Sequence, residues 1–302
     1  MMSDICTRLD HEIRKAYIGD THTLQALVVA FLCGGHVLLE GAPGLAKTTL
    51  AHALAQAVDA QFRRIQFTAD LMPADITGSS LYRISDGDFK FIPGPVFTHI
   101  LLADEINRAP ARTQSALLEA MQEGQVTADG CTHPLPDPFF VIATQNTLEE
   151  RGTFPLPLSE LDRFMFRLRL DYPTEAQERQ ILRLSTTSPS PIIPQLDPKA
   201  CLAARADIAR IHVSDPIVEY ISDLIRATRT TPGIISGASP RAGVMLLRAA
   251  RGFAWSEERD FVSPEDVARA TPLTLNHRLV LSPASPSVDE VIRNILARTA
   301  FH

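Results

Sequence analysis

A glycine-rich stretch around residue 44 carries residue types that bind polyphosphate. An apolar strand over residues 37–39 runs into a loop that ends in Lys47 and Thr48, at the start of a predicted helix. The backbone N–H groups of such a loop and the positive end of the helix point at one place, which suits phosphate. Lys47 would then reach the β- and γ-phosphates of a nucleotide, and the Thr48 hydroxyl would ligate Mg²⁺. The predicted nucleotide-binding residues of this loop are Gly41, Ala42, Pro43, Gly44, Leu45, Ala46, Lys47, Thr48 and Thr49.

One position departs from the general pattern of this motif. A Gly normally stands directly before the Lys, whereas this chain has Ala46. An ordinary Gly/Pro turn before a helix has a similar composition, so the loop alone leaves that alternative open.

Two adjacent carboxylates, Asp104 and Glu105, follow the apolar run 99–103. A strand without polar alternation is buried on both faces, as in a parallel sheet. The two acids could be solvated loop charges, but ligands of parallel α/β sheets bind outside the carboxyl ends of the strands, where the glycine-rich loop also lies. We therefore predict that Asp104 holds the Mg²⁺ shell and that Glu105 polarises the attacking water.

Three further polar residues stand at element ends. Asn146 follows the apolar strand 139–143 and could bond both the γ-phosphate and the attacking water, although Asn is also common in turns. Arg163 precedes a strand and Arg241 opens a helix, and in a chain with this many Arg either could be an ordinary surface residue. An Arg supplied to a γ-phosphate contributes roughly 10³–10⁵ in rate.

The elements that must position these residues change in kind along the chain. Strands alternate with helices at first, and after about residue 172 the pattern is helical. This predicts an α/β nucleotide-binding core followed by a small all-α domain. The predicted ranges are 1–172 for the core with its N-terminal helices, 173–200 for a linker and 201–302 for a C-terminal helical lid. Within the core we expect strands at 62–67, 99–103, 139–143 and 164–170, and hairpins within 68–97 and 125–135.

The composition limits the class of protein. The chain has 302 residues, is 45% hydrophobic and carries a net charge of −6, so it can bury a sizeable core and has no bulk attraction to nucleic acid or anionic membrane. Its four scattered Cys residues have no metal-ligand spacing, which fits reduced thiols. We find no signal peptide and no apolar run near the roughly 20 residues that span a membrane, so we expect a cytoplasmic protein without membrane insertion.

Longer segments extend these motifs. Residues 35–48 read GHVLLEGAPGLAKT, residues 100–110 read ILLADEINRAP, and residues 161–164 read LDRF. With them the chain resembles the MoxR family of AAA+ ATPases over about residues 18–300, and an Ala before the loop Lys is usual in that family. The other matching segments are 70–78, 91–97, 114–127, 143–146 and 237–242.

The resemblance implies a fold and a role for each candidate residue. The fold would be an AAA+ P-loop αβα core with strand order 5-1-4-3-2, an insertion in the second helix at 68–93, a hairpin at 125–137 and a helical lid. Lys47 and Thr48 correspond to Walker A, Asp104 and Glu105 to Walker B, and Asn146 to sensor 1. Arg163 corresponds to the arginine finger presented to a neighbouring subunit, and Arg241 to sensor 2, in cis or in trans. Ile18 and Gly19 match the segment that flanks adenine, although Asp20 stands where a Gln is expected.

The resemblance also implies an activity. Members are ring-forming, Mg²⁺-dependent ATP hydrolases, commonly hexamers, which act as chaperones that mature other protein complexes. Their partners often carry a von Willebrand factor A domain. The implied cofactors are ATP and Mg²⁺. The acidic balance of the chain separately indicates that it has no nucleic-acid partner.

Two other functions remain open from the residues. A nucleic-acid motor shares this core, but the acidic balance and the lack of a basic stripe interleaved with aromatics count against it. A nucleotide sensor that does not hydrolyse ATP is the second, and the presence of Glu105, Asn146 and Arg163 counts against it. The sequence leaves open the client protein, the ring size and the stepping order.

Overall fold

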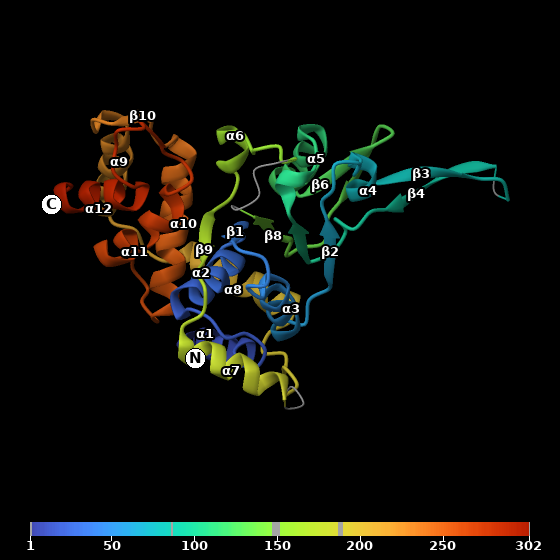
Figure 1. The fold of residues 1–302 in the computed structure, drawn as a ribbon, viewed down its shortest axis with the longest axis horizontal. Coiled ribbons are helices and arrows are strands. Elements are labelled where there is room, and N and C mark those ends of the chain that lie inside the picture. The colour runs from blue at the N-terminus through green and yellow to red at the C-terminus, as the bar shows by residue number, and fades with distance from the viewer. Residues whose placement is uncertain (1, 86, 147–151, 187–189, 302) are drawn as a thin grey trace.

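Five parallel strands form the central sheet of the computed structural model (Figure 1), which describes residues 2–85, 87–146, 152–186 and 190–301. Their order is β2-β5-β8-β1-β9, and each neighbouring pair runs parallel. Numbered within the sheet alone and read from the β9 edge, this is the predicted order 5-1-4-3-2, which is confirmed. The strands are β1 (Val37–Gly41), β2 (Phe62–Gln66), β5 (Ile100–Asp104), β8 (Phe140–Gln145) and β9 (Phe166–Leu170).

Alternate residues of the strands face two separate hydrophobic cores. Val37 and Leu39 lie in one cluster, and Leu38 between them lies in the other. Because successive side chains of a strand point to opposite faces, the sheet is buried on both sides in an αβα arrangement, as the unbroken apolar runs predict. The first cluster includes residues of α1 (Met2–Ile13), α2 (Thr21–Leu32) and α3 (Lys47–Ala57), and the second includes residues of α4 (Pro73–Thr77) and α5 (Ala111–Glu123).

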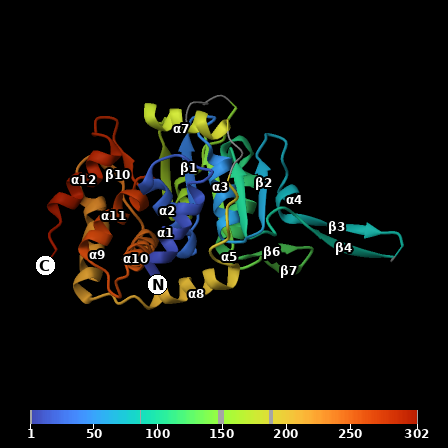
Figure 2. The ribbon, with the colours of Figure 1, turned by 90° about the horizontal axis from the view of Figure 1, so that it is seen from below.

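Two β-hairpins extend from the core. The predicted hairpins are confirmed as the antiparallel pairs β3 (Gly78–Arg83) with β4 (Asp88–Pro93) and β6 (Gln125–Ala128) with β7 (Cys131–Pro134). The β3–β4 hairpin projects well away from the body of the molecule (Figure 2). The rings of Phe91 and His133 stack at 3.9 Å and join the two hairpins.

The C-terminal region is the predicted helical lid. It also contains a two-stranded antiparallel sheet that the sequence did not predict, made by the segment between its helices α9 and α10 and the segment between α11 and α12. Ser239 and Ser287 cap their helices by accepting a hydrogen bond from a backbone N–H in the first turn. The elements are α8 (Pro198–Arg210), α9 (Asp215–Thr230), β10 (Ile234–Ser236), α10 (Pro240–Ser256), α11 (Pro264–Leu275), β11 (Val280–Leu281) and α12 (Val288–Arg298).

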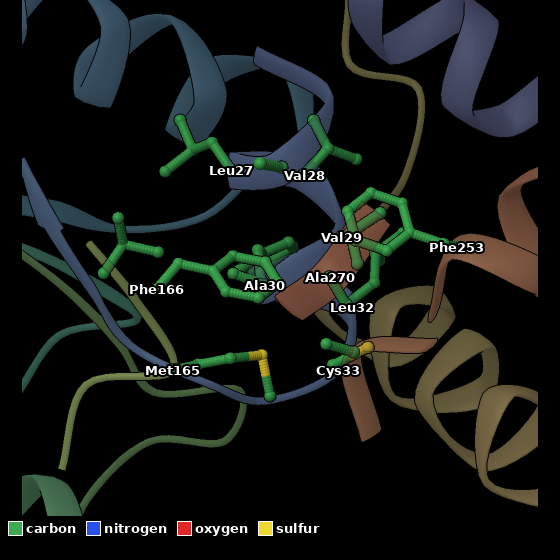
Figure 3. Close-up of a cluster of buried hydrophobic side chains, with 14 of the residues drawn as sticks. Leu27, Val28, Val29, Ala30, Leu32, Cys33, Met165, Phe166, Phe253 and Ala270 are labelled. Carbon is green, nitrogen blue, oxygen red and sulfur yellow. The ribbon is translucent and has the colours of Figure 1, made fainter. Parts of the chain in front are cut away.

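Helix α2 joins the core to the lid. Residues 26–32 are all buried. Figure 3 shows Val29, Ala30 and Leu32 of this stretch with Phe166 of β9 on one side and Phe253 of α10 on the other. A helix that is apolar on every side is one enclosed by protein. The lid and the sheet therefore share one continuous hydrophobic cluster.

The proposed boundaries of 1–172, 173–200 and 201–302 stay a prediction. Most of the predicted linker is occupied by α7 (Glu175–Ser185) and by the segment that leads into α8. In the described part of the chain, no helix combines the length and apolarity needed to cross a membrane.

Candidate active site

The carboxyl ends of β1, β2, β5 and β8 surround a pocket of about 390 Å³, here named the P-loop pocket. Strand register explains the meeting, because Gln66 at the end of β2 pairs with Asp104 at the end of β5. The predicted phosphate, Mg²⁺ and water residues are thus brought together. The pocket is lined by Pro43, Gly44, Leu45, Ala46, Lys47, Thr48, Thr49, Arg64, Gln66, Asp104, Glu105 and Asn146.

The loop enters α3 through a left-handed residue. Ala46 has φ 55° and ψ 26°, and α3 begins directly after it. A left-handed non-glycine residue costs about 1–2 kcal/mol, which explains why the general motif has Gly at this position. Among the described residues, no side chain caps this helix start, and N–H groups at such a start favour an anion.

Lys47 folds back over its own loop. Its Nζ donates to the Gly41 carbonyl at 2.7 Å and lies 3.4 Å from the Ala42 carbonyl oxygen. Partial burial lowers the pKa of Lys47, and the charges of Asp104 and Glu105 act in the opposite direction. Lys47 and both carboxylates line the same pocket.

Thr144 positions the two acids. Its buried hydroxyl donates to Asp104 Oδ1 at 2.6 Å and accepts the backbone N–H of Glu105 at 2.9 Å. Glu105 has φ 55°, so the chain turns sharply where the strand ends. Strain of this kind is concentrated at functional sites.

Each carboxylate also has basic or amide donors. Arg64 Nη2 donates to Asp104 Oδ2 at 2.7 Å. The other acid, Glu105, accepts from Gln66 Nε2 at 3.0 Å and pairs with Arg108 Nε at 2.8 Å, Arg108 being the last residue of a 3₁₀ turn (Ile106–Arg108). The acids of the pocket are therefore held by a network that reaches from β2 to the turn after β5.

A second, larger pocket of about 640 Å³ adjoins the P-loop pocket and shares Gly44, Leu45, Ala46 and Thr49 with it. Ile18 and Gly19, which are predicted to flank a nucleotide base, line this adjoining pocket. Asp20, where a Gln was expected, caps α2 by accepting the Thr23 N–H at 2.8 Å. The adjoining pocket is lined by residues 16–20, Thr23, residues 44–46, Thr49, residues 169–174, Gln177, Ile181, Leu184 and Ser185.

Arg163 and Arg241 lie elsewhere. They line a third pocket of about 330 Å³, here named the arginine pocket, with residues 34–36, Met121, Gln122, Met165, Val244, Met245 and Arg248. Among the described residues, none lines both this pocket and the P-loop pocket. Arg163 Nη1 donates to the Leu118 carbonyl at 2.8 Å, and its Nε is 3.3 Å from Glu160 of α6 (Leu158–Leu161). The chain therefore does not bring these two arginines to its own loop.

Residues 36–166 match the ATPase family associated with various cellular activities (AAA), and residues 226–295 match the AAA lid domain. The chain is 42% identical to the protein YeaC of Bacillus subtilis (strain 168), over 94% of this chain and 91% of that protein. It is 41% identical to "Chaperone MoxR1" of Mycobacterium tuberculosis, over 90% of this chain and 74% of that one. The chain belongs to the MoxR family of AAA ATPases. A crystal structure from Cytophaga hutchinsonii, of a protein described as a candidate ATPase, superposes with a TM-score of 0.92 at 37% identity, covering 100% of this chain and 96% of that one.

The two matched ranges together cover the candidate site residues from Lys47 to Arg241, but they divide them differently from the pockets, because Arg163 falls in the AAA match and Arg241 in the lid match. The AAA match includes Lys47, Asp104, Glu105, Asn146 and Arg163, and the lid match includes the helix that begins beside Arg241. A family of AAA ATPases implies ATP binding and hydrolysis. Thr48 and Asp104 place a hydroxyl and a carboxylate in one pocket, which fits the oxygen ligands that Mg²⁺ takes besides substrate phosphates.

Sequence reasoning did not assign Arg64, Gln66, Arg108 or Thr144. Gln66 had a usable signal, because in the strand order 5-1-4-3-2 the second strand ends next to the third, which carries the acids. Thr144 lies inside the quoted segment 143–146, but its role depends on which neighbouring strand its side chain meets.

The four cysteines contribute nothing to these pockets. Cys33 and Cys201 are buried, and all four thiols are free. Burial raises the pKa of Cys6, Cys33 and Cys201 to about 12, so these thiols are protonated and unreactive at neutral pH.

Proposed function

We propose that this MoxR-family chain hydrolyses Mg²⁺-bound ATP at a boundary between two copies of itself and uses the energy to remodel a partner protein complex. The separation of the two pockets carries this proposal. The P-loop pocket holds the residues that bind nucleotide and activate water, while Arg163 and Arg241 line a different pocket of the same chain. A second copy is then needed to bring arginine to the phosphate.

Within one copy, the P-loop pocket binds and orients the reactants. Lys47 contacts the β- and γ-phosphates, while Thr48 and Asp104 hold Mg²⁺, which when bound neutralises charge developing on the phosphate oxygens. Glu105 takes a proton from the attacking water and Asn146 fixes the γ-phosphate. The base lies in the adjoining pocket against Ile18 and Gly19.

The neighbouring copy supplies the arginine pocket. Arg163 acts there as the finger that stabilises the transition state. We assign Arg241 to the same action in trans, because it lines one pocket with Arg163 rather than the pocket of its own loop. A head-to-tail contact of this kind closes into a ring, for which we propose a hexamer.

The proposed remodelling role is based on similarity to related proteins. One relative is named a chaperone, and the family resemblance adds a partner with a von Willebrand factor A domain and a cytoplasmic location. The β3–β4 hairpin, whose Ile84 is 91% exposed, gives the ring an apolar projection for contact with a client.

The test is turnover measured against protein concentration. Phosphate release per chain should rise steeply with concentration, because each site needs a second copy. Glu105→Gln should bind ATP and not release phosphate. Mixing it with the inactive Arg163→Ala should restore turnover, because the Glu105→Gln copy presents an intact arginine to the intact P-loop pocket of its neighbour. Turnover that is linear in a monomeric protein, or no recovery on mixing, would overturn the proposal.

A further inference from the structure

The end of helix α11 inserts a charged residue beneath the loop that carries Arg163. Asn276, His277 and Arg278 follow this lid helix, and Arg278 is only 2% exposed. Burying a guanidinium is costly unless its charge and its donors are satisfied. The partners of Arg278 therefore indicate what this segment holds in place.

Arg278 binds the backbone on both sides of Arg163. Its Nη2 donates to the carbonyl oxygens of Asp162 at 2.9 Å and of Phe164 at 2.7 Å. These bonds hold the peptide unit directly before Arg163 and the one directly after Phe164, so that the direction of the Arg163 side chain depends on a lid residue.

The Asp162 side chain closes the arrangement. Its Oδ1 accepts from Arg278 Nε at 2.6 Å, and its Oδ2 accepts from the hydroxyl of Ser239 at 2.9 Å. Ser239 is the N-cap of α10, two residues before Arg241. One carboxylate thus joins the loop of Arg163 to the helix start that carries Arg241.

A second contact ties Arg278 to the same helix. Its Nη2 lies 2.8 Å from the sulfur of Met245, which is one turn after Arg241 on α10 and lines the arginine pocket. Burial lowers the pKa of Arg278, while the Asp162 carboxylate opposes that shift. The buried charge is therefore compensated by the residue that joins the two arginine-bearing elements.

We propose that Asp162 and Arg278 are positioning residues that hold Arg163 and Arg241 as one rigid pair, presented together to the ATP of the neighbouring copy. The inference rests on the proposed function, in which these arginines act in trans. A displacement of about 1 Å at a reacting group costs about 100-fold in rate, so the lid sets the efficiency of a neighbour's site through this clamp.

The test is complementation between variants of the full-length chain. Asp162→Asn keeps the side-chain size and removes the charge. Its kcat should fall about 10- to 100-fold, with KM for ATP unchanged within about twofold, because its own P-loop pocket is intact. Adding an excess of Glu105→Gln should restore turnover, since those copies present an intact arginine pair to the Asp162→Asn copies. Damage to the fold would not be repaired in this way.

A second substitution in the clamp and a control substitution outside it complete the test. Ser239→Ala removes one of the clamp bonds and should lower kcat about threefold, again with recovery on mixing. Asp260→Asn, at an exposed carboxylate of the lid, is the matched control and should leave kcat unchanged. Should Asp162→Asn fail to fold by circular dichroism, Ser239→Ala and Arg278→Lys carry the same mixing test.

Two failures are distinguishable. If Arg163→Ala is not restored by Glu105→Gln, the proposed action in trans is overturned. If Arg163→Ala is restored, while the clamp variants keep wild-type kcat or lose it without recovery, the positioning role is overturned and the clamp only joins the lid to the core.

Discussion

The P-loop pocket and the arginine pocket rest on different supports. Four strand ends of one sheet surround the first, and their register fixes Asp104 against Gln66 and Thr144. The second lies where α10 of the lid meets the loop before β9, and its arginines depend on contacts between lid and core. The residues of the P-loop pocket are therefore positioned by the sheet. The arginines that would act on a neighbouring copy are instead positioned by the lid.

Because the two pockets are separate, one substitution should reduce ATP affinity and another should reduce turnover alone. These two substitutions should give the largest effects. Lys47→Ala should weaken ATP binding about 100-fold, because it removes a charged donor from the loop. Arg163→Ala should lower turnover roughly 10³-fold and leave ATP affinity within about twofold of wild type. Calorimetric ATP titration and phosphate release measure the two quantities. Lys90→Ala and Arg112→Ala, at exposed positions, are the controls. Loss of ATP affinity in Arg163→Ala would remove the distinction between the pockets.

Lowering the pH should reduce the stability of the protein through a histidine that lines the arginine pocket. His36 lines that pocket, and its ring accepts the Val141 N–H at 3.1 Å and bonds the Met121 carbonyl at 3.1 Å, which requires the neutral ring. Burial lowers the pKa of His36 from 6.5 to about 4. The unfolded chain therefore binds a proton that the folded chain excludes, and stability is lost as the pH falls from 6.5 towards 4, by about 3 kcal/mol.

Urea unfolding at several pH values checks the size of this loss. His36→Gln cannot take up the proton and should lose less stability than wild type between pH 7 and pH 4. His22→Gln, at an exposed position, should behave as wild type. Equal acid sensitivity in wild type and His36→Gln would refute the assignment.

Thr144 offers an intermediate effect confined to the P-loop pocket. Thr144→Val keeps the shape but removes the hydroxyl that holds Asp104 and the Glu105 N–H. Turnover should fall about tenfold and the free energy of unfolding by about 1–3 kcal/mol, because a buried donor is left unsatisfied. Thr271→Val, a buried threonine of the lid that donates to Val267, is the matched control. It should change stability alone, as measured by urea unfolding beside phosphate release.

The smallest effect concerns the loop itself. Ala46→Gly relieves a left-handed conformation worth about 1–2 kcal/mol, against about 0.4–1 kcal/mol of added unfolded-state entropy. The variant should be about 0.5 kcal/mol more stable with unchanged turnover. Ala55→Gly, in the regular part of α3, should instead lose about 1 kcal/mol or more. A destabilised Ala46→Gly would show that the methyl group contributes packing that outweighs the strain.

Much of the P-loop pocket was predictable because its residues stand at ends of apolar runs. Asp104, Glu105 and Asn146 each follow a buried strand, and parallel strands place such ends at one edge. The strand order, which decides which ends are neighbours, came from family resemblance rather than from periodicity. Strand β9 lies at the edge of the sheet, and its alternation of apolar residues with Arg167 and Arg169 is typical of such a strand.

The unpredicted residues act across long sequence separations. Arg64 and Asp104 are 40 positions apart, and Asp162 and Arg278 are 116 apart. No local pattern distinguishes an Arg that pairs in this way from other Arg residues of the chain. Their roles depend on strand register and on the angle of the lid, which local sequence does not encode.

Helix α7 offers a way to observe the adjoining pocket directly. It borders that pocket with Gln177, Ile181 and Leu184, yet none of its 11 residues is buried, all of them being described. A capping box at Thr174 holds its start, but a helix this short is marginal on its own in water. Its amide hydrogens should therefore exchange rapidly with solvent and slow when a nucleotide base packs against it. Deuterium uptake in this one peptide would report the fraction of chains that hold nucleotide.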